Sequence, residues 1–386
     1  MSVALTDQLA KCRIVLAANI VDGYPSEFEY TKEFLLSNGV GKLTTISHPL
    51  QRRSSSKSRV VRYEEGKATR NITIPRPNIP PMTHVLDFGT GLLPIKSDIW
   101  IGFNPIMTAM GALVPKSKVL ANWAIDFVPN RGEIGIAEKF YRGTERFMMN
   151  HLDAQIENSR AALEARVEAT GIKPSCQLLA PIGVWKDSFS APVGTRHKQR
   201  RIVYFGSLDK RNGAPFLAEL LAVLLQMDSD VMVDVIGEGD SSEAFLNLVE
   251  RFPQQICYHG YIERQSEIDL ILRRCVLALA PYDETPGSFT EFADPQKLKY
   301  YAANGLPVIL TNVAPSAIAM KESGAAILLS QSDGLGVWVD AILALLNNFD
   351  AWEEAANNSF SYALKFERNN VYAETFSSLL SLLESK

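Results

Sequence analysis

Short apolar runs alternate with helical stretches throughout the second half of the sequence. The runs are rich in Val, Ile, Leu and Ala, which is typical of strands buried on both faces. Parallel neighbours in a sheet need a crossover between them, so this alternation predicts a parallel sheet covered by helices. The predicted strands are 202–205, 231–236, 256–259, 276–280, 308–310 and 326–329.

The first half shows the same alternation less regularly. Strands are predicted at 13–18, 43–46, 84–88, 99–103 and 119–125, and helices at 26–37, 105–113, 133–150 and 153–170. A chain of 386 residues is long for a single core. We therefore expect an α/β protein with two Rossmann-like parallel-sheet domains, at 1–185 and 186–365, and a C-terminal helix at 366–386. Residues 186–200 are predicted to be the linker, because they lack apolar periodicity.

The composition argues against several classes of protein. The net charge of -4 does not suit a general nucleic-acid binder. The four cysteines show no C-x-x-C spacing and are expected to be reduced core residues. The sequence has no signal-peptide pattern and no apolar run of membrane-spanning length, so we expect a cytoplasmic protein.

One basic stretch, residues 51–62, contains no acidic side chain. A run of like charges usually forms a solvated loop. The alternative is peripheral contact with an anionic lipid surface at the inner membrane face, or with an acceptor. The basic residues of this stretch are Arg52, Arg53, Lys57, Arg59 and Arg62.

Residues 292–312 predict a helix that leads directly into a buried strand. Asp294 is a suitable N-cap and Pro295 suits the first helical position. Asn304 and Gly305 provide a left-handed exit before the apolar run. Because the helix follows a Gly/Ser loop at the end of a predicted strand, its N-terminus is a candidate anion site.

The same segment resembles the donor-site signature of family 4 glycosyltransferases, which have the GT-B fold. The matching run is Pro295-x-Lys297-x-x-x-Tyr301-x-Ala303-x-Gly305-x-Pro307-Val308. The resemblance implies two Rossmann-like domains facing across a cleft, with the last helix crossing back to the first domain. It also implies a retaining, metal-independent transfer of sugar from a nucleotide-diphosphate sugar to a glycan, lipid-linked or small-molecule acceptor, without a bound cofactor or metal.

The resemblance carries over to several positions of the donor site. Lys297, together with Lys210 and Arg211 in the loop after the strand at 202–205, would stabilise the charge of the leaving diphosphate. The family's ribose-binding glutamate is replaced by Tyr300, so either Tyr300 or Glu291 is expected to contact the ribose. The other implied donor contacts are Gly206, Ser207, Gly260, Tyr261, Ile262, Ser288 and Phe289.

Asp126 follows the predicted strand at 119–125, at the edge where doubly wound sheets bind ligands. A carboxylate there could accept the proton of the acceptor hydroxyl or bind a sugar hydroxyl. The alternative is that Asp126 only caps a turn before Pro129.

Two further functions stay open at this point. A nucleotide-sugar epimerase would bind the nucleotide similarly but needs several acid–base groups. A sugar-nucleotide binding module without turnover is consistent with the missing ribose glutamate. The five histidines are dispersed, and neither a hydrolytic elbow nor a Walker loop occurs, so neither a metal site nor a hydrolase is predicted.

Overall fold

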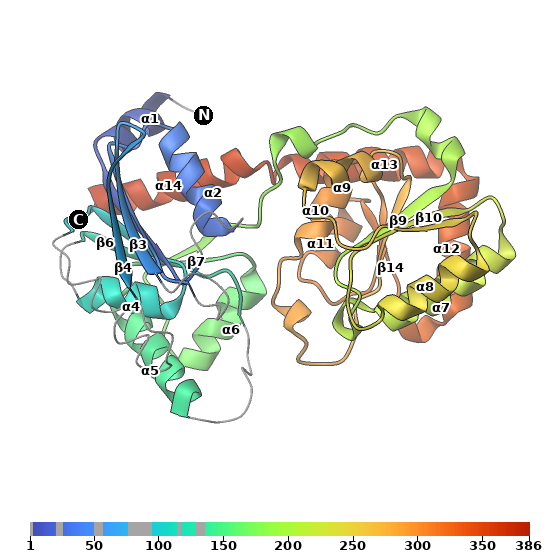
Figure 1. Ribbon diagram of the computed structural model, residues 1–386, viewed down its shortest axis with the longest axis horizontal. Helices are drawn as coiled ribbons and strands as arrows, with labels where there is room; N and C mark the ends of the chain where they lie inside the picture. Colours follow the sequence, from blue (N-terminus) through green and yellow to red (C-terminus); the bar gives the residue numbers. More distant parts are fainter. Residues whose placement is uncertain (1–2, 21–25, 50–56, 76–94, 114–116, 128–135) are drawn as a thin grey trace. The chain divides into compact units, whose positions relative to one another are not determined.

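The computed structural model describes residues 3–20, 26–49, 57–75, 95–113, 117–127 and 136–386. The chain forms two compact units, each with its own sheet (Figure 1). Unit 1 contains Met1–Pro181 and Asn369–Lys386, and unit 2 contains Ile182–Arg368. The predicted strand at 84–88 lies outside the described residues.

Unit 2 contains a six-stranded sheet in which every pair of neighbours is parallel. The order β11-β10-β9-β12-β13-β14 is that of a doubly wound nucleotide-binding sheet. It confirms the predicted alternation, because each of the predicted strands of this half is present. Their bounds are β9 Arg201–Phe205, β10 Met232–Ile236, β11 Ile256–Tyr258, β12 Leu277–Ala280, β13 Val308–Leu310 and β14 Ala326–Leu328.

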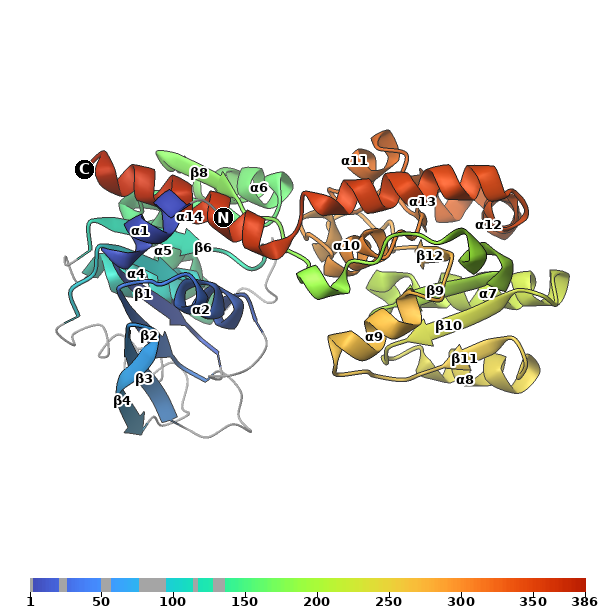
Figure 2. The same ribbon diagram turned by 90° about the horizontal axis from the view of Figure 1, so that it is seen from above.

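Helices cover both faces of this sheet, so the strands are apolar on both sides. Helices α7, α8 and α12 bury one face, and α9, α10 and α11 the other (Figures 1 and 2). Their bounds are α7 Ala214–Met227, α8 Ser242–Arg251, α9 Gln265–Leu272, α10 Gln296–Ala303, α11 Ala317–Glu322, α12 Leu335–Asn347 and α13 Phe349–Leu364.

Unit 1 contains an eight-stranded sheet, β4-β3-β2-β1-β5-β6-β7-β8, which is parallel except at one end. There β3 pairs antiparallel with β2 and β4. The bounds are β1 Arg13–Ala18, β2 Lys42–Ser47, β3 Lys57–Glu64, β4 Lys67–Pro75, β5 Ile99–Gly102, β6 Val119–Trp123, β7 Ala154–Glu157 and β8 Cys176–Leu179.

The antiparallel hairpin corrects the expected basic loop. Lys57, Arg59 and Arg62 belong to β3, whereas Arg52 and Arg53 lie outside the described residues. The hairpin turns at Glu65 and Gly66, both at positive φ. This is the two-residue turn that matches the twist of adjacent strands. A short turn that ends in glycine, between two stretches of alternating side chains, was the sequence signal that could have revealed this hairpin.

The helices of unit 1 are α1 Val3–Ala10, α2 Glu27–Ser37, α4 Pro105–Leu113, α5 Ile136–His151, α6 Arg160–Thr170 and α14 Arg368–Glu384. The predicted helix at 153–170 is wrong in its first part, which is strand β7. Helix α6 starts only at Arg160, where the Ser159 side chain accepts from Ala162 N–H. Helix α14 supplies Tyr372 and Phe376 to the core of unit 1, where they pack around Phe34 and Trp123.

The predicted linker is a packed part of unit 2. Arg196 is buried, and its guanidinium donates to the carbonyls of Asn304 and Gly305 at the end of α10, at 2.9 and 3.1 Å. These contacts satisfy carbonyls that the helix leaves without partners. Low apolar periodicity therefore does not indicate a free segment here.

Candidate functional site

The loops that follow β9, β10 and β11 are stacked at the carboxyl edge of the unit 2 sheet. Gly206 N–H donates to Ile236 O at 2.9 Å, and Gly237 N–H donates to Gly260 O at 2.8 Å. Gly237 has φ +133°, and a Cβ there would lie 1.9 Å from Gly206 O. Only glycine allows this approach, so the loops form one closely packed layer.

A second close approach spans the point where the strand order reverses, between β9 and β12. Gly213 has φ +74°, and a Cβ there would lie 1.5 Å from Pro281 O. The loop after β9 therefore lies directly against the end of β12. In doubly wound sheets this reversal point is where ligands bind.

Lys297, in the first turn of α10, extends to this point. Its Nζ lies 3.1 Å from Asn212 Oδ1 and 3.5 Å from the Tyr204 hydroxyl. The same atom lies 4.7 and 4.4 Å from the ring centroids of Tyr204 and Tyr282. Lys297 is only 8% exposed. The structure thus places this amine in an aromatic and amide environment.

Burial lowers the pKa of Lys297 to about 7. Within the part of the chain that the structure describes, its hydrogen-bond partners are neutral. The Tyr282 hydroxyl is also buried, with no hydrogen-bond partner among the described residues. An anion at this point would stabilise the charged amine, and it would give the site a partner for its desolvated donors.

Lys210 and Arg211 lie on the same loop, in a short 3-10 helix over Lys210–Asn212. Both are exposed, and the Arg211 guanidinium is 3.3 Å from Asp209. Burial raises the pKa of Asp209, but hydrogen bonds from Asn212 and the charge of Arg211 outweigh it and leave the pKa lowered. The structure therefore places Lys210 and Arg211 on the loop that Lys297 contacts through Asn212, and the role of all three cations stays a prediction.

The predicted helix cap is wrong. Asp294 does not cap α10. Its carboxylate accepts from Ile182 N–H at 2.7 Å and forms a buried ion pair with Lys299. The helix starts at Gln296, after Pro295, without a side-chain cap. A carboxylate can satisfy a cation and a backbone N–H at once, and here the cation lies five residues along the chain.

Tyr300 lies on α10, three residues after Lys297. It is 1% exposed and belongs to the core of unit 2. Helix α10 is buried on nearly all sides, so its side-chain pattern had no polar face to show which way Tyr300 points. A ribose contact by Tyr300 stays a prediction, and the other candidate is Glu291. It is half-buried, and its carboxylate accepts from Gly287 N–H at 2.9 Å.

The remaining predicted donor residues surround the same edge. Ser288 caps the 3-10 helix Phe289–Glu291 by accepting from Thr290 N–H at 3.2 Å. Tyr261 is 70% exposed, and its N–H donates to Glu238 at 3.3 Å. Ile262 packs against the core, and Ser207 is exposed while its carbonyl accepts from Tyr204.

Asp126 lies in unit 1, three residues beyond the end of β6, and it is exposed. It lines a cavity of about 390 Å³ at the carboxyl edge of the sheet, together with Asn104 and Phe103. Its backbone carbonyl accepts from Arg166 at 2.9 Å. The position at the sheet edge agrees with the prediction, and the catalytic role stays a prediction.

Sequence reasoning missed three residues that shape the site: Tyr204, Asn212 and Tyr282. Tyr204 was hidden inside an apolar strand. Asn212 directly precedes Gly213, and a polar side chain before a glycine of a strand–helix loop was the signal that could have found it. Tyr282 follows Pro281 at the end of β12, a position where functional side chains gather.

Comparison with known protein families gives a match within unit 2. A model of the family Glycosyl transferases group 1 matches residues 199–348. A search of curated proteins gives no match to the sequence. The likeness to family 4 is thus confirmed at the level of group 1, and the finer assignment to family 4 stays a prediction.

Solved structures share the fold over nearly the whole chain. Sucrose-phosphate synthase from Thermosynechococcus elongatus is 13% identical with a TM-score of 0.70, covering 97% of this chain and 100% of that one. Anabaena HepE, solved in complex with UDP, is 13% identical with a TM-score of 0.62, covering 96% and 99%. TarM, from S. aureus, is 10% identical with a TM-score of 0.65, covering 97% and 99%.

Among the described helices, none is both long and apolar enough to cross a membrane. Residues 199–348 thus match the model of group 1 glycosyltransferases, and the chain has the two-domain fold of the solved structures above, GT-B.

Proposed function

We propose that this protein is a glycosyltransferase that moves a sugar from a nucleotide-diphosphate sugar to a hydroxyl acceptor, with retention at the anomeric carbon and without a metal ion or bound cofactor. Unit 2 binds the donor, and unit 1 binds a glycan, lipid-linked or small-molecule acceptor. The first donor to test is a UDP-sugar, because HepE has been solved with UDP-glucose and TarM with UDP.

One observation carries this proposal: a buried lysine whose hydrogen-bond partners are neutral, at the reversal point of a nucleotide-binding sheet. Lys297 is buried at the end of β9 and β12, with its Nζ against Asn212 and two tyrosine rings. A buried ammonium group is costly unless an anion approaches it. The donor diphosphate supplies that anion. Lys210 and Arg211 lie on the loop that contains Asn212 and are proposed to contact the outer oxygens of the diphosphate.

The cations act on the leaving group. As the bond between the anomeric carbon and the phosphate oxygen breaks, negative charge accumulates on the diphosphate. Fixed positive charges that are already desolvated stabilise this charge more than they stabilise the intact donor. In metal-dependent transferases a divalent cation stabilises the charge of the leaving diphosphate. Lysine and arginine side chains can take the place of that cation.

The acceptor hydroxyl loses its proton as its oxygen bonds to the anomeric carbon. In unit 1, Asp126 is the proposed recipient of that proton, or else a contact for a sugar hydroxyl. It lines the cavity at the end of β6 and is exposed. If Asp126 is only a turn residue, an oxygen of the departing phosphate remains as the base.

Incubation with donor alone distinguishes this proposal from its alternatives. The full chain is mixed with UDP-glucose, and with the GDP-, ADP- and dTDP-linked sugars, in buffer containing EDTA. Slow release of sugar in its α-form, followed by ¹H NMR, is expected from a retaining transferase acting on water. A new nucleotide-linked sugar isomer would indicate an epimerase, and tight binding with no product would indicate a binding module.

A further inference from the structure

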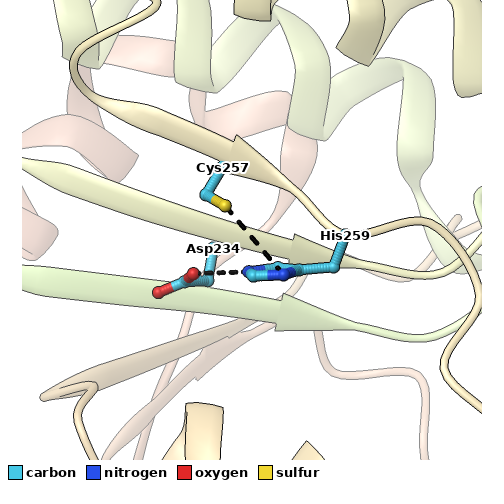
Figure 3. Close-up of side chains that lie close together, drawn as sticks. All are labelled: Asp234, Cys257 and His259. Atoms are coloured by element: carbon cyan, nitrogen blue, oxygen red, sulfur yellow. Dashed lines mark hydrogen bonds and ion pairs between the residues drawn. The ribbon is translucent and has the colours of Figure 1, made fainter.

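Cys257 and His259 lie two residues apart at the outer edge of unit 2. Strand β11 is the edge strand, and residues i and i+2 of a strand project from the same face. Cys257 is the register partner of Asp234 on β10. Figure 3 shows that the three side chains form a chain of contacts, with the His259 ring between the carboxylate and the sulfur. The sequence had suggested scattered histidines and cysteines, whereas the fold brings these two together.

The contacts of the His259 ring indicate which of its two nitrogens carries the proton. Nε2 lies 2.7 Å from Asp234 Oδ1, and Nδ1 lies 3.9 Å from Cys257 Sγ. Arg201 and Arg274 also donate to the Asp234 carboxylate, each at 2.9 Å. The carboxylate thus acts as an acceptor, so Nε2 is the nitrogen that carries the proton. In the neutral ring, the Nδ1 lone pair then faces the sulfur.

Asp234 itself cannot be a metal ligand in this arrangement. It is fully buried, and its two oxygens already accept from Arg201 and Arg274, each at 2.9 Å. The Cys275 thiol also points to it at 3.6 Å. Its role is to hold the imidazole, as carboxylates do behind metal-bound histidines. Cys257 is exposed and the His259 side chain is 18% exposed, so the candidate ligand atoms are Cys257 Sγ and His259 Nδ1.

We propose that Cys257 Sγ and His259 Nδ1 bind one thiophilic divalent cation of the Zn²⁺ type. Tetrahedral zinc, with Zn–S of about 2.3 Å and Zn–N of about 2.0 Å, separates sulfur and nitrogen by about 3.5 Å. The 3.9 Å in the structure needs only a small rotation of the exposed Cys257 side chain. Soft thiolate and imidazole donors favour zinc over magnesium or calcium.

Two protein ligands leave coordination positions for water or a small molecule. The site is therefore open and exchangeable, with lower affinity than a closed four-ligand zinc site. Binding replaces the S–H bond by a metal–sulfur bond, and the thiol proton passes to the buffer. The test needs no sugar nucleotide, so its outcome is independent of the proposed function.

The test uses the full chain, reduced and freed of metal, titrated with Co²⁺ as a spectroscopic probe for Zn²⁺. We expect thiolate-to-cobalt absorption that saturates at one ion per chain, with release of about one proton, and displacement by Zn²⁺. Cys257→Ser should abolish the charge-transfer band, and His259→Gln should weaken Co²⁺ binding at least ~10-fold. Cys176→Ser and His151→Gln are matched controls and should titrate like the wild type.

The role of Asp234 in orienting the His259 ring can be tested separately, by measuring which ring nitrogen is protonated. The ¹⁵N chemical shifts of the His259 ring should show the Nε2-protonated tautomer in the metal-free protein. A ring protonated on Nδ1 has no lone pair toward the sulfur and would overturn the proposal. So would the absence of saturable absorption, or a band that survives Cys257→Ser.

Discussion

Each unit buries a cation near the carboxyl edge of its sheet, but the two cations have opposite surroundings. In unit 1, Arg166 forms ion pairs with both Glu145 and Glu157, and Glu157 also accepts from Gln155 at 2.8 Å. In unit 2, the buried Lys297 contacts an amide oxygen and tyrosines. The comparison teaches that burial of a charge does not by itself identify a binding site. Lys297 is a candidate because it also lies where the strand order reverses, next to Tyr282, whose hydroxyl has no hydrogen-bond partner among the described residues.

The electrostatics follow from this difference. Burial would lower the pKa of Arg166, but the charges of Glu157 and Glu145 outweigh the effect of burial and raise this pKa. For Lys297 burial is the dominant influence, and the pKa falls to about 7. Arg166 is thus part of the structure of unit 1, whereas the charge on Lys297 depends on what binds.

The largest effect should come from breaking the paired cation. Arg166→Met leaves two buried carboxylates without their partner, which typically costs about 3–5 kcal/mol. We expect urea denaturation, followed by circular dichroism, to show this loss of stability, whereas donor binding to unit 2 stays unchanged below the transition. Unchanged stability would mean that the ion pairs of Arg166 contribute little.

Removing the other cation should instead reduce activity. Lys297→Met should lower kcat/KM roughly 10- to 1000-fold, the loss expected for about 1.4 to 4 kcal/mol of transition-state stabilisation. The protonated amine is costly when buried, so this variant should be at least as stable as the wild type at pH 6. The exposed Lys321→Met is the matched control. Normal kinetics in folded Lys297→Met would remove Lys297 from the site.

The pH dependence of donor binding sharpens the same contrast. Lys297 is protonated below its pKa of about 7 and loses the proton as pH rises. If the diphosphate needs the charged amine, the Kd for donor should increase by up to ~10-fold per pH unit above pH 7. Isothermal titration calorimetry between pH 6 and 9 measures this. A pH-dependent Kd that persists unchanged in Lys297→Met would assign the titration to another group.

In unit 1, substitution of Asp126 is expected to lower kcat by at least ~10-fold. Asp126→Asn keeps the shape and removes the charge, so a base at this position should lose kcat while donor affinity and melting temperature stay the same. Near-normal turnover in this variant would leave the donor phosphate as the base.

The smallest effect concerns the ribose. Tyr300→Phe should leave donor affinity unchanged within about 2-fold, because the side chain lies in the core. Glu291→Gln should weaken nucleotide binding by several-fold, consistent with a loss of about 1 kcal/mol when a charged hydrogen bond becomes a neutral one. The reverse ranking, measured by equilibrium binding of nucleotide, would restore Tyr300 as the ribose contact.

The sequence was sufficient for unit 2 because its strands are buried on both faces and appear as apolar runs. In unit 1, β3 has mostly polar side chains, β4 is mostly exposed, and β7 is a short strand directly before a helix. None of these three strands appears in the sequence as an apolar run like those of unit 2. Lys297 could be predicted from its motif, but its partners Asn212 and Tyr282 come from other strand ends. Asp294 was wrongly predicted as a cap because a helix pattern does not show that its carboxylate pairs with the buried Lys299.

The stacked glycines have a consequence for how the sequence of this loop layer can vary. A Cβ at Gly213 or Gly237 would meet a backbone oxygen, which no rotamer of a neighbour can relieve. At Gly66 or Gly287, where nothing lies within 4 Å, only the backbone angle opposes substitution. In a library randomised at all four positions and selected for folded protein, positions 213 and 237 should return glycine alone, while asparagine and aspartate also appear at 66 and 287.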